Sequence, residues 1–194
     1  MAKLYFRYGT VGSAKTLNLL AVAHNYQQQG KRALILKPAL DTRFGPNAVA
    51  SRAGLTKDAD LLVDTATKLT AATLDGIHCV LVDEAQFLDP MFIDQLRWVS
   101  SSLNIPVICY GLRTDFRRHL FAGSRRLMEI ADAIEEVKMT CAYCNRKAVF
   151  NLKFVNGNAT LDGPSIELGA EEKYLPACAP CYGLKTGLAA QATP

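Results

Sequence analysis

The chain has 194 residues, 49% of them hydrophobic, which is enough for one well-packed core and a small additional module. Its 22 basic and 18 acidic residues leave a net charge of +4, short of the dense basic surface of a dedicated nucleic-acid binder. No hydrophobic run approaches the roughly 20 residues of a membrane span, and the first residues become charged too early for a signal peptide. These features predict a cytoplasmic protein, in which cysteines serve as metal ligands or core residues more often than in disulfides.

Short apolar strands alternate with helical segments along the first part of the chain. We expect strands at residues 4–8, 33–36, 79–82 and 106–110, and helices at residues 15–28 and about 91–102. Continuous apolar strands with helices between them are typical of a parallel sheet that is covered on both faces. The sequence therefore predicts an α/β fold for this part of the chain.

The composition and the hydrophobic pattern of the sequence change after about Lys138. Cysteine pairs, glycines and prolines replace the periodic pattern, and residues 156–174 are rich in glycine and polar residues, which predicts a hairpin followed by a loop. We therefore expect a nucleotide-binding domain at residues 1–138 and a small second domain at residues 139–194.

The segment between the first predicted strand and helix carries a phosphate-binding motif. It reads Gly9-Thr10-Val11-Gly12-Ser13-Ala14-Lys15-Thr16, which is G-x-x-x-x-G-K-[ST] with Ala14 in place of the second glycine. Backbone N–H groups and a helix N-terminus can hold the tail of ATP there, with Lys15 on the β- and γ-phosphates and the Thr16 hydroxyl on Mg²⁺. The alternative is an ordinary glycine-containing turn, but the strand before it and the helix after it favour the phosphate loop. If position 14 requires a positive φ angle, the Cβ of Ala14 strains the loop.

A second motif follows the predicted strand at residues 79–82. The strand runs directly into Asp83-Glu84-Ala85-Gln86-Phe87, and an apolar strand that ends in Asp is the Walker-B pattern. This pattern places the Asp83 carboxylate near Mg²⁺ at the carboxyl edge of the sheet, and Glu84 could accept a proton from an incoming nucleophile. Together the two motifs indicate a site for a nucleoside triphosphate and Mg²⁺, without identifying the phosphate acceptor.

Four of the six cysteines form two C-x-x-C pairs, Cys141 with Cys144 and Cys178 with Cys181. Paired knuckles of this kind bind tetrahedral Zn²⁺, and four thiolates leave no open position for water, so we expect a structural zinc. Four unrelated thiols or a redox pair are the alternatives. Cys79 and Cys109 lie inside apolar strands and are expected to be core residues.

These motifs, together with Tyr110-Gly111-Leu112-x-x-Asp115-Phe116, resemble type II thymidine kinases over essentially the whole chain. The resemblance implies a RecA-like P-loop domain, a zinc-anchored lasso that closes over the nucleoside, and a homotetramer. It implies transfer of the γ-phosphate of ATP to the 5′-hydroxyl of thymidine, with deoxyuridine possible, giving dTMP in deoxynucleoside salvage. The implied cofactors are ATP, Mg²⁺ and structural Zn²⁺, with no nucleic-acid or membrane partner.

The resemblance also assigns roles to individual residues. Glu84 is similar to the family's general base, Asp83 to its Mg²⁺-side carboxylate, and Asp41-x-Arg43 to an Asp-x-Arg motif whose arginine steadies phosphate charge. The implied catalytic set is Glu84, Lys15 and Arg43, and Gln86 lies at the nucleotide side of the adjoining wall. The residues implied to enclose the nucleoside are Phe87, Leu112, Phe116, Phe121, Ile166, Leu168 and Tyr174. The aromatic members of this set could also form a flat apolar slot on chemical grounds alone.

The chain departs from the family pattern at three positions. Ala14 replaces a glycine, Arg113 stands where the family usually has Asp, and Val11 stands where Met often lies near the thymine methyl group. Two other classes of protein would also contain some of these motifs. One is a P-loop ATPase whose zinc ribbon binds nucleic acid, and the other is a non-catalytic zinc-ribbon protein that senses ATP. The modest charge and the absence of a second set of ATPase motifs count against the first of these.

Overall fold

The computed structural model describes residues 1–166 and 174–188. In chain order, the elements are β1 (Leu4–Tyr8), α1 (Lys15–Gln28), β2 (Ala33–Pro38), β3 (Ala48–Ala50), β4 (Thr56–Asp58), β5 (Leu61–Val63), β6 (Cys79–Val82), the 3₁₀-helix η1 (Ala85–Phe87), α2 (Pro90–Ser102), β7 (Val107–Gly111), α3 (Ala122–Ile130), β8 (Ala133–Glu136), β9 (Phe150–Val155), β10 (Asn158–Thr160), β11 (Tyr174–Ala177) and α4 (Ala179–Thr186). None of the described helices is both long and apolar enough to cross a bilayer.

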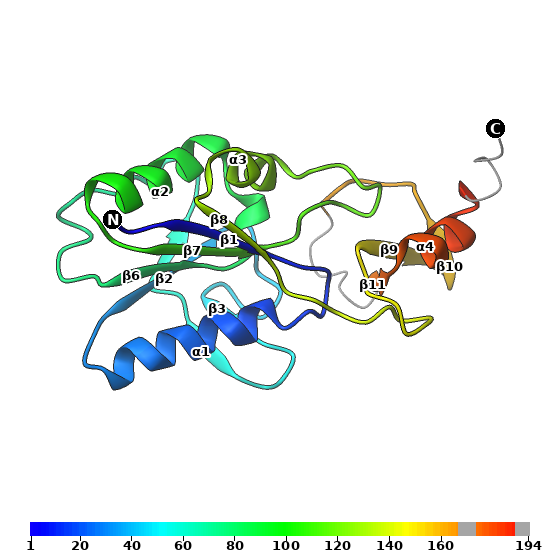
Figure 1. Cartoon of the computed structure of the whole chain (residues 1–194), viewed down its shortest axis with the longest axis horizontal. Coiled ribbons are helices and arrows are strands. Elements are labelled where there is room, and N and C mark those ends of the chain that lie inside the picture. Colours follow the sequence, from blue (N-terminus) through cyan, green and yellow to red (C-terminus); the bar gives the residue numbers. More distant parts are fainter. Residues whose placement is uncertain (167–173, 189–194) are drawn as a thin grey trace.

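The main domain is a six-stranded sheet in the order β5-β2-β6-β7-β1-β8, in which every neighbouring pair is parallel. Helix α1 covers one face of the sheet, and α2 and α3 cover the other (Figure 1). The prediction of a parallel sheet with helices on both faces is therefore confirmed. The order places β1 and β6 on either side of β7, so the loops that follow β1 and β6 open at the same edge of the sheet.

Side-chain alternation along the strands explains the two covered faces. In β6, Val80 and Val82 pack into the cluster under α2 and α3, whereas Cys79 and Leu81 pack into the cluster under α1. All four are fully buried, as expected for a central strand whose residues point alternately to opposite faces. Cys109 is also fully buried in β7, so the prediction that Cys79 and Cys109 are core residues is confirmed.

A separate three-stranded antiparallel sheet has the order β10-β9-β11, with α4 beside it. We call the described residues 139–166 and 174–188 the cysteine module. Its small core contains Leu152, Ala177 and Tyr182 together with Cys141 and Cys178. The module lies beside the carboxyl edge of the parallel sheet (Figure 1), and its Tyr182 hydroxyl donates a hydrogen bond to the backbone carbonyl of Phe116.

Several elements were not expected from the sequence. Strand β8 joins the edge of the main sheet beside β1, but its residues, Ala-Ile-Glu-Glu, are half-buried or exposed and give no apolar run. The short strands β3, β4 and β5 have only three residues each, which is too short for a periodic pattern to be recognised. Helix α3 begins at Ala122, in a segment for which no helix was predicted.

Candidate active site

A cavity of about 390 Å³ opens at the carboxyl edge of the parallel sheet. It is lined by the phosphate loop, by the segments that follow β2, β3, β6 and β7, and by residues of the cysteine module. Most of the predicted site residues line it: Val11, Gly12, Ser13, Ala14, Lys15, Thr16, Arg43, Asp83, Glu84, Phe87, Leu112, Phe116, Phe121, Ile166 and Tyr174. The structure thus brings both halves of the predicted site, phosphate side and nucleoside side, into one cavity.

The phosphate loop turns sharply between β1 and α1. Gly12 has a φ angle of 79° and Ala14 one of 62°, so both adopt the left-handed conformation that favours glycine. The Lys15 ammonium, largely buried, donates to the Thr10 carbonyl at 2.8 Å and lies 3.3 Å from the Gly9 carbonyl and from Ser13 Oγ. Burial lowers the pKa of Lys15 to about 8, against the opposing influence of the charges of Glu84 and Asp83. A phosphate group entering this loop would offer the ammonium an anionic partner in place of the loop oxygens.

Two oxygen ligands suited to Mg²⁺ meet beside the loop. The Thr16 hydroxyl, in the first turn of α1, lies 3.2 Å from each carboxylate oxygen of Asp83 at the end of β6. Burial and the neighbouring Glu84 charge raise the pKa of the Asp83 carboxyl above its ordinary value. Hydroxyl and carboxylate oxygens are the ligands that Mg²⁺ takes in nucleotide sites, so these two residues fit the ion.

Glu84 lies next to Asp83 and also faces the cavity. Its φ angle is 48°, and its Oε1 lies 2.7 Å from Nη2 of Arg43, while its Oε2 accepts a hydrogen bond from the side-chain amide of Gln86. Burial alone would raise the pKa of Glu84, but the charges of Arg43 and Lys15 hold it below its ordinary value. Glu84 is therefore an ionised carboxylate whose orientation is fixed by two donors.

Arg43 is held in place from the opposite side. Its Nε lies 2.6 Å from Oδ1 of Asp41 and its Nη2 lies 3.0 Å from Oδ2, a bidentate arrangement. Asp41 in turn lies 3.7 Å from the ammonium of Lys37, which is almost fully buried and donates to the Ala48 carbonyl at 2.7 Å. Asp41 thus fixes the guanidinium of Arg43 beside the carboxylate of Glu84.

Aromatic rings form the other wall of the cavity. The rings of Phe87 and Phe121 meet edge to face with centroids 5.7 Å apart, and those of Phe116 and Tyr174 lie 6.3 Å apart. The Tyr174 ring belongs to β11, so the cysteine module contributes directly to this wall. The predicted substrate residue Leu168 lies outside the described residues.

Three residues predicted to bind the nucleotide do not line the cavity: Gly9, Thr10 and Gln86. Gly9 packs where a Cβ would lie 2.6 Å from the Val137 carbonyl, so only glycine fits this turn. Gln86 is buried behind the site, where its Oε1 accepts from the Leu112 N–H at 2.9 Å while its amide nitrogen donates to Glu84. Its side chain thus links the Glu84 carboxylate to the backbone at Leu112, and its role in binding the nucleotide stays a prediction.

The sequence analysis missed several residues that line the cavity: Phe44, Arg52, Thr114, Asp115, Asn151 and Ser165. Asp115 holds Ser165 of the loop after β10, since Ser165 Oγ donates to its Oδ2 at 2.8 Å and Arg117 donates to the same hydroxyl at 2.6 Å. Asp115 belongs to the motif Tyr110-Gly111-Leu112-x-x-Asp115-Phe116, so its position was visible in the sequence. Arg52 and Asn151 belong to no motif, and no local signal marked them.

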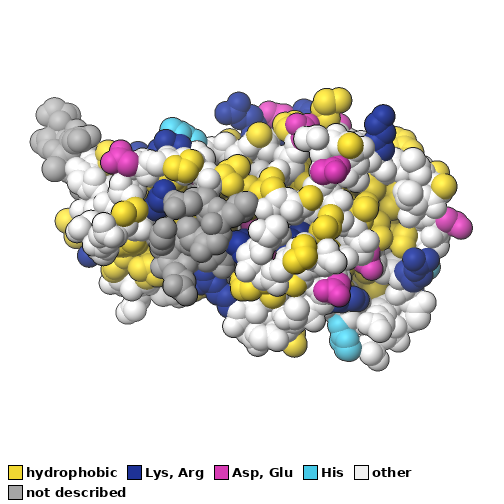
Figure 2. Space-filling view, turned by 180° about the vertical axis from the view of Figure 1, so that it is seen from behind, with side chains coloured by type: hydrophobic (Ala, Val, Ile, Leu, Met, Phe, Trp, Pro, Cys, Tyr) yellow, Lys and Arg dark blue, Asp and Glu magenta, His cyan; other side chains and the backbone are white. Residues whose placement is uncertain are grey.

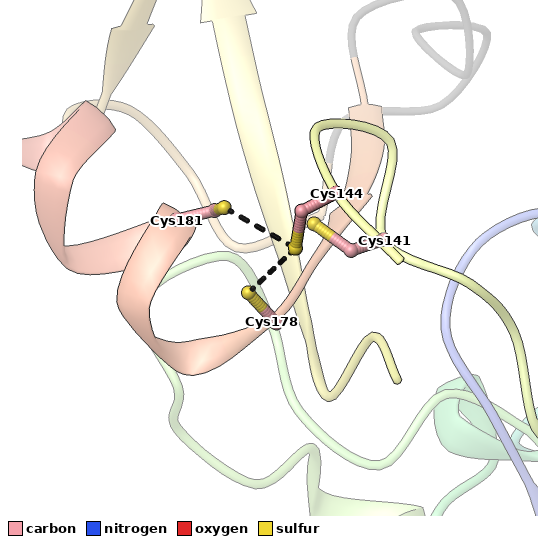
Figure 3. Close-up of side chains that lie close together, drawn as sticks. All are labelled: Cys141, Cys144, Cys178 and Cys181. Atoms are coloured by element: carbon pink, nitrogen blue, oxygen red, sulfur yellow. Dashed lines mark hydrogen bonds between the residues drawn. The ribbon is translucent and has the colours of Figure 1, made fainter. Parts of the chain in front are cut away.

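The four paired cysteines converge on one point between the loop at residues 141–144 and the start of α4 (Figure 3). Their sulfur atoms all lie within 4.8 Å of one another, with 3.6 Å between Cys144 and Cys178 and 3.8 Å between Cys181 and Cys144. Four thiolates around a zinc at about 2.3 Å would be about 3.8 Å apart, whereas a disulfide would bring two of them to about 2.0 Å. The cluster therefore fits a tetrahedral metal ion, and it rules out disulfides between these sulfurs.

The fold and the cavity define a P-loop nucleotide-binding protein with a cluster of four cysteines that could hold a metal ion. The family model described as "Thymidine kinase" matches residues 2–182, and the chain belongs to this family. A thymidine kinase of Streptococcus pyogenes serotype M3 is 42% identical over 184 residues, covering 94% of this chain and 97% of its own. One of Lactiplantibacillus plantarum is 43% identical over 180 residues, covering 92% and 94%. Among solved structures, the Pif1 helicase of Candida albicans superposes with a TM-score of 0.42 at 11% identity, over 70% of this chain and 36% of that one.

Proposed function

We propose that this protein is an ATP-dependent thymidine kinase, which transfers the γ-phosphate of ATP to the 5′-hydroxyl of thymidine. Family membership and the relatives at 42% identity support the reaction. The observation that carries the proposal is one cavity with a phosphate loop at one end, an aromatic slot at the other, and the Glu84 carboxylate lining the same space. An acceptor hydroxyl bound in the slot would lie between Glu84 and the phosphates.

Each polar group has a distinct part in this proposal. Lys15 and the loop N–H groups hold the phosphates, and Thr16 and Asp83 hold Mg²⁺, which when bound neutralises charge that develops on the transferring phosphoryl group. Glu84 accepts the proton of the 5′-hydroxyl as the new P–O bond forms. Arg43, fixed by Asp41, stabilises negative charge on the phosphoryl oxygens and so acts on the same reacting atoms.

The ion pair between Arg43 and Glu84 allows Arg43 to stabilise phosphate charge while Glu84 accepts a proton at the same site. A nucleotide in the cavity adds phosphate charge beside the guanidinium, which already contacts Asp41 and Glu84, and this negative charge raises the pKa of Glu84. The carboxylate then becomes a better proton acceptor when phosphates are present than in the protein alone. Before the substrates bind, Arg43 and Gln86 hold the Glu84 side chain in position.

We also propose that the chain divides into two domains after residue 138 and that each domain binds a different substrate. Residues 1–138 bind ATP, and residues 139–194, anchored by structural zinc on Cys141, Cys144, Cys178 and Cys181, close over the nucleoside. Tyr174, at the start of the strand that leads to Cys178, and Ser165 line the cavity from this second part. A homotetramer in the cytoplasm, working in deoxynucleoside salvage, completes the proposal; zinc-bound thiolates and a need for ATP suit that reducing compartment.

The face of the molecule in Figure 2 bears on the nucleic-acid alternative. Among the described residues, basic, acidic and hydrophobic side chains are interspersed there, and these residues form no single basic stripe on this face. The test is ATP consumption measured with thymidine, with DNA and with neither, using Lys15→Ala as the inactive control. Turnover that depends on thymidine supports the kinase. Stimulation by DNA instead, or no turnover under any condition, would refute it.

A further inference from the structure

One hydrogen bond joins the cysteine module to the phosphate loop. The side-chain Oδ1 of Asn151, in β9, accepts from the backbone N–H of Val11 at 2.9 Å, although the two residues are 140 positions apart in the chain. Asn151 is only 4% exposed and lines the cavity. The orientation of its amide is defined, because an N–H group can only donate and the amide oxygen is the only acceptor on this side chain.

Strand β9 fixes the position of Asn151. β9 is the central strand of the module's sheet, between β10 and β11, and Asn151 is paired with Pro176 of β11. The next residue, Leu152, is fully buried in the module's core with Cys141 and Cys178. Because successive residues of a strand point to opposite faces, Leu152 anchors β9 in the core while Asn151 points toward the main domain.

The phosphate loop gains an external support from this bond. Within the loop, the Ser13 N–H reaches the Thr10 carbonyl at 3.2 Å, and Ala14 adopts a left-handed conformation, which persists in a non-glycine residue only where the surrounding structure holds it. The Val11 N–H is satisfied from outside, by a side chain that a folded module holds. A loop that is already ordered does not have to be ordered when the ligand binds.

We propose that Asn151 is a positioning residue for the phosphate loop, through which the cysteine module acts on ATP binding as well as on nucleoside binding. The inference deepens the proposed function and rests on it for the identity of the nucleotide. It assigns the module a second task, at the opposite end of the cavity from the aromatic slot. If removal of the bond leaves about one loop in ten in the binding-competent conformation, the apparent Kd for MgATP rises about tenfold.

The experiment compares four variants of the zinc-loaded protein. Asn151→Leu keeps the branched arrangement of heavy atoms but removes the acceptor, Asn151→Ala removes the side chain, and Asn151→Asp keeps an acceptor of the same shape. Asn158→Ala is the matched control, since Asn158 lies in the same module but is exposed and does not line the cavity. The readouts are hydrogen exchange of the Val11 amide without nucleotide, and the Kd values of MgATP and thymidine measured separately by calorimetry.

We expect faster exchange of the Val11 amide and an MgATP Kd raised about tenfold in the Leu and Ala variants, with the thymidine Kd close to the wild-type value. Asn151→Asp should restore slow exchange, and Asn158→Ala should change nothing. An unchanged MgATP Kd in a folded, zinc-loaded Leu variant would overturn the proposal. Equal increases in the Kd values of MgATP and thymidine would also overturn it. An Asp variant that fails to restore slow exchange of the Val11 amide would overturn it as well. Because the calorimetric arm requires no phosphoryl transfer, it can be evaluated even if thymidine turnover is absent and the proposed function fails.

Discussion

Replacing Glu84 with glutamine tests the proposed proton acceptor most directly. The side chains have nearly the same shape, so the substitution removes one negative charge and one basic site with little change in packing. Arg43 loses its partner at 2.7 Å but keeps the bidentate contact with Asp41, at 2.6 and 3.0 Å, so its position should hold. Asp83 and Thr16 remain in place to bind Mg²⁺.

The size of the effect follows from the role. A positioned general base is typically worth about 10²–10⁴-fold in rate, or roughly 3–5 kcal/mol of barrier. Phosphoryl transfer also depends on positioning, and a loose transition state needs less help from a base, so we expect the lower part of this range. Glu84→Gln should therefore lower kcat by about two orders of magnitude or more, with the KM for ATP nearly unchanged.

The assay is steady-state dTMP formation at saturating ATP and thymidine, repeated over a series of Mg²⁺ concentrations. If Glu84 only orients a Mg²⁺-bound water, raising Mg²⁺ should restore most of the activity of the variant. A variant that keeps more than about a tenth of the wild-type kcat would refute the role of Glu84 as base. Circular dichroism and the KM for ATP show whether the fold and the phosphate side are intact.

Three further predictions concern the loop and the cysteines. Ala14→Gly should be tolerated and raise the Tm or the ATP affinity modestly, because glycine relieves a left-handed conformation that costs an L-residue about 1 kcal/mol; loss of activity would show that the loop register is wrong. As the pH rises through about 8, Lys15 of the nucleotide-free protein loses its proton, so MgATP binding should weaken. Binding should then also take up a proton, which calorimetry in buffers of different ionisation enthalpy can detect. This proton uptake should be absent in Lys15→Arg. Cys178→Ser should lower the zinc content and raise the KM for thymidine, whereas zinc-free wild-type protein with full activity would contradict a structural metal.

Contiguous motifs could be predicted from the sequence because their geometry is local. The residues from Gly9 to Thr16 form a loop whose shape depends on neighbours in the chain, and the run after β6 reaches the same sheet edge because β6 and β1 are parallel to the strand between them. The left-handed φ of Ala14 was also foreseeable, since that position normally carries glycine.

Contacts between distant segments could not be predicted. The bond between Val11 and Asn151 depends on how β9 is placed relative to the main sheet, and a single asparagine in a strand carries no signal of that placement. Gln86 shows a second difference between sequence and structure, because its neighbours in the chain line the cavity while its own side-chain oxygen accepts a hydrogen bond from the Leu112 N–H. An edge strand such as β8 lacks the apolar run by which the central strands were recognised.

The backbone at Glu84 explains how two adjacent carboxylates serve one cavity. Successive side chains of an extended strand point to opposite faces, so a straight continuation of β6 would turn either Asp83 or Glu84 away from the site. The φ angle of 48° at Glu84 breaks this alternation at the point where the strand ends and η1 begins. Asp83 can therefore reach Thr16 while Glu84 reaches Arg43, and both line the cavity. A left-handed glutamate is strained, and in the proposed mechanism this conformational cost sets the direction of the carboxylate.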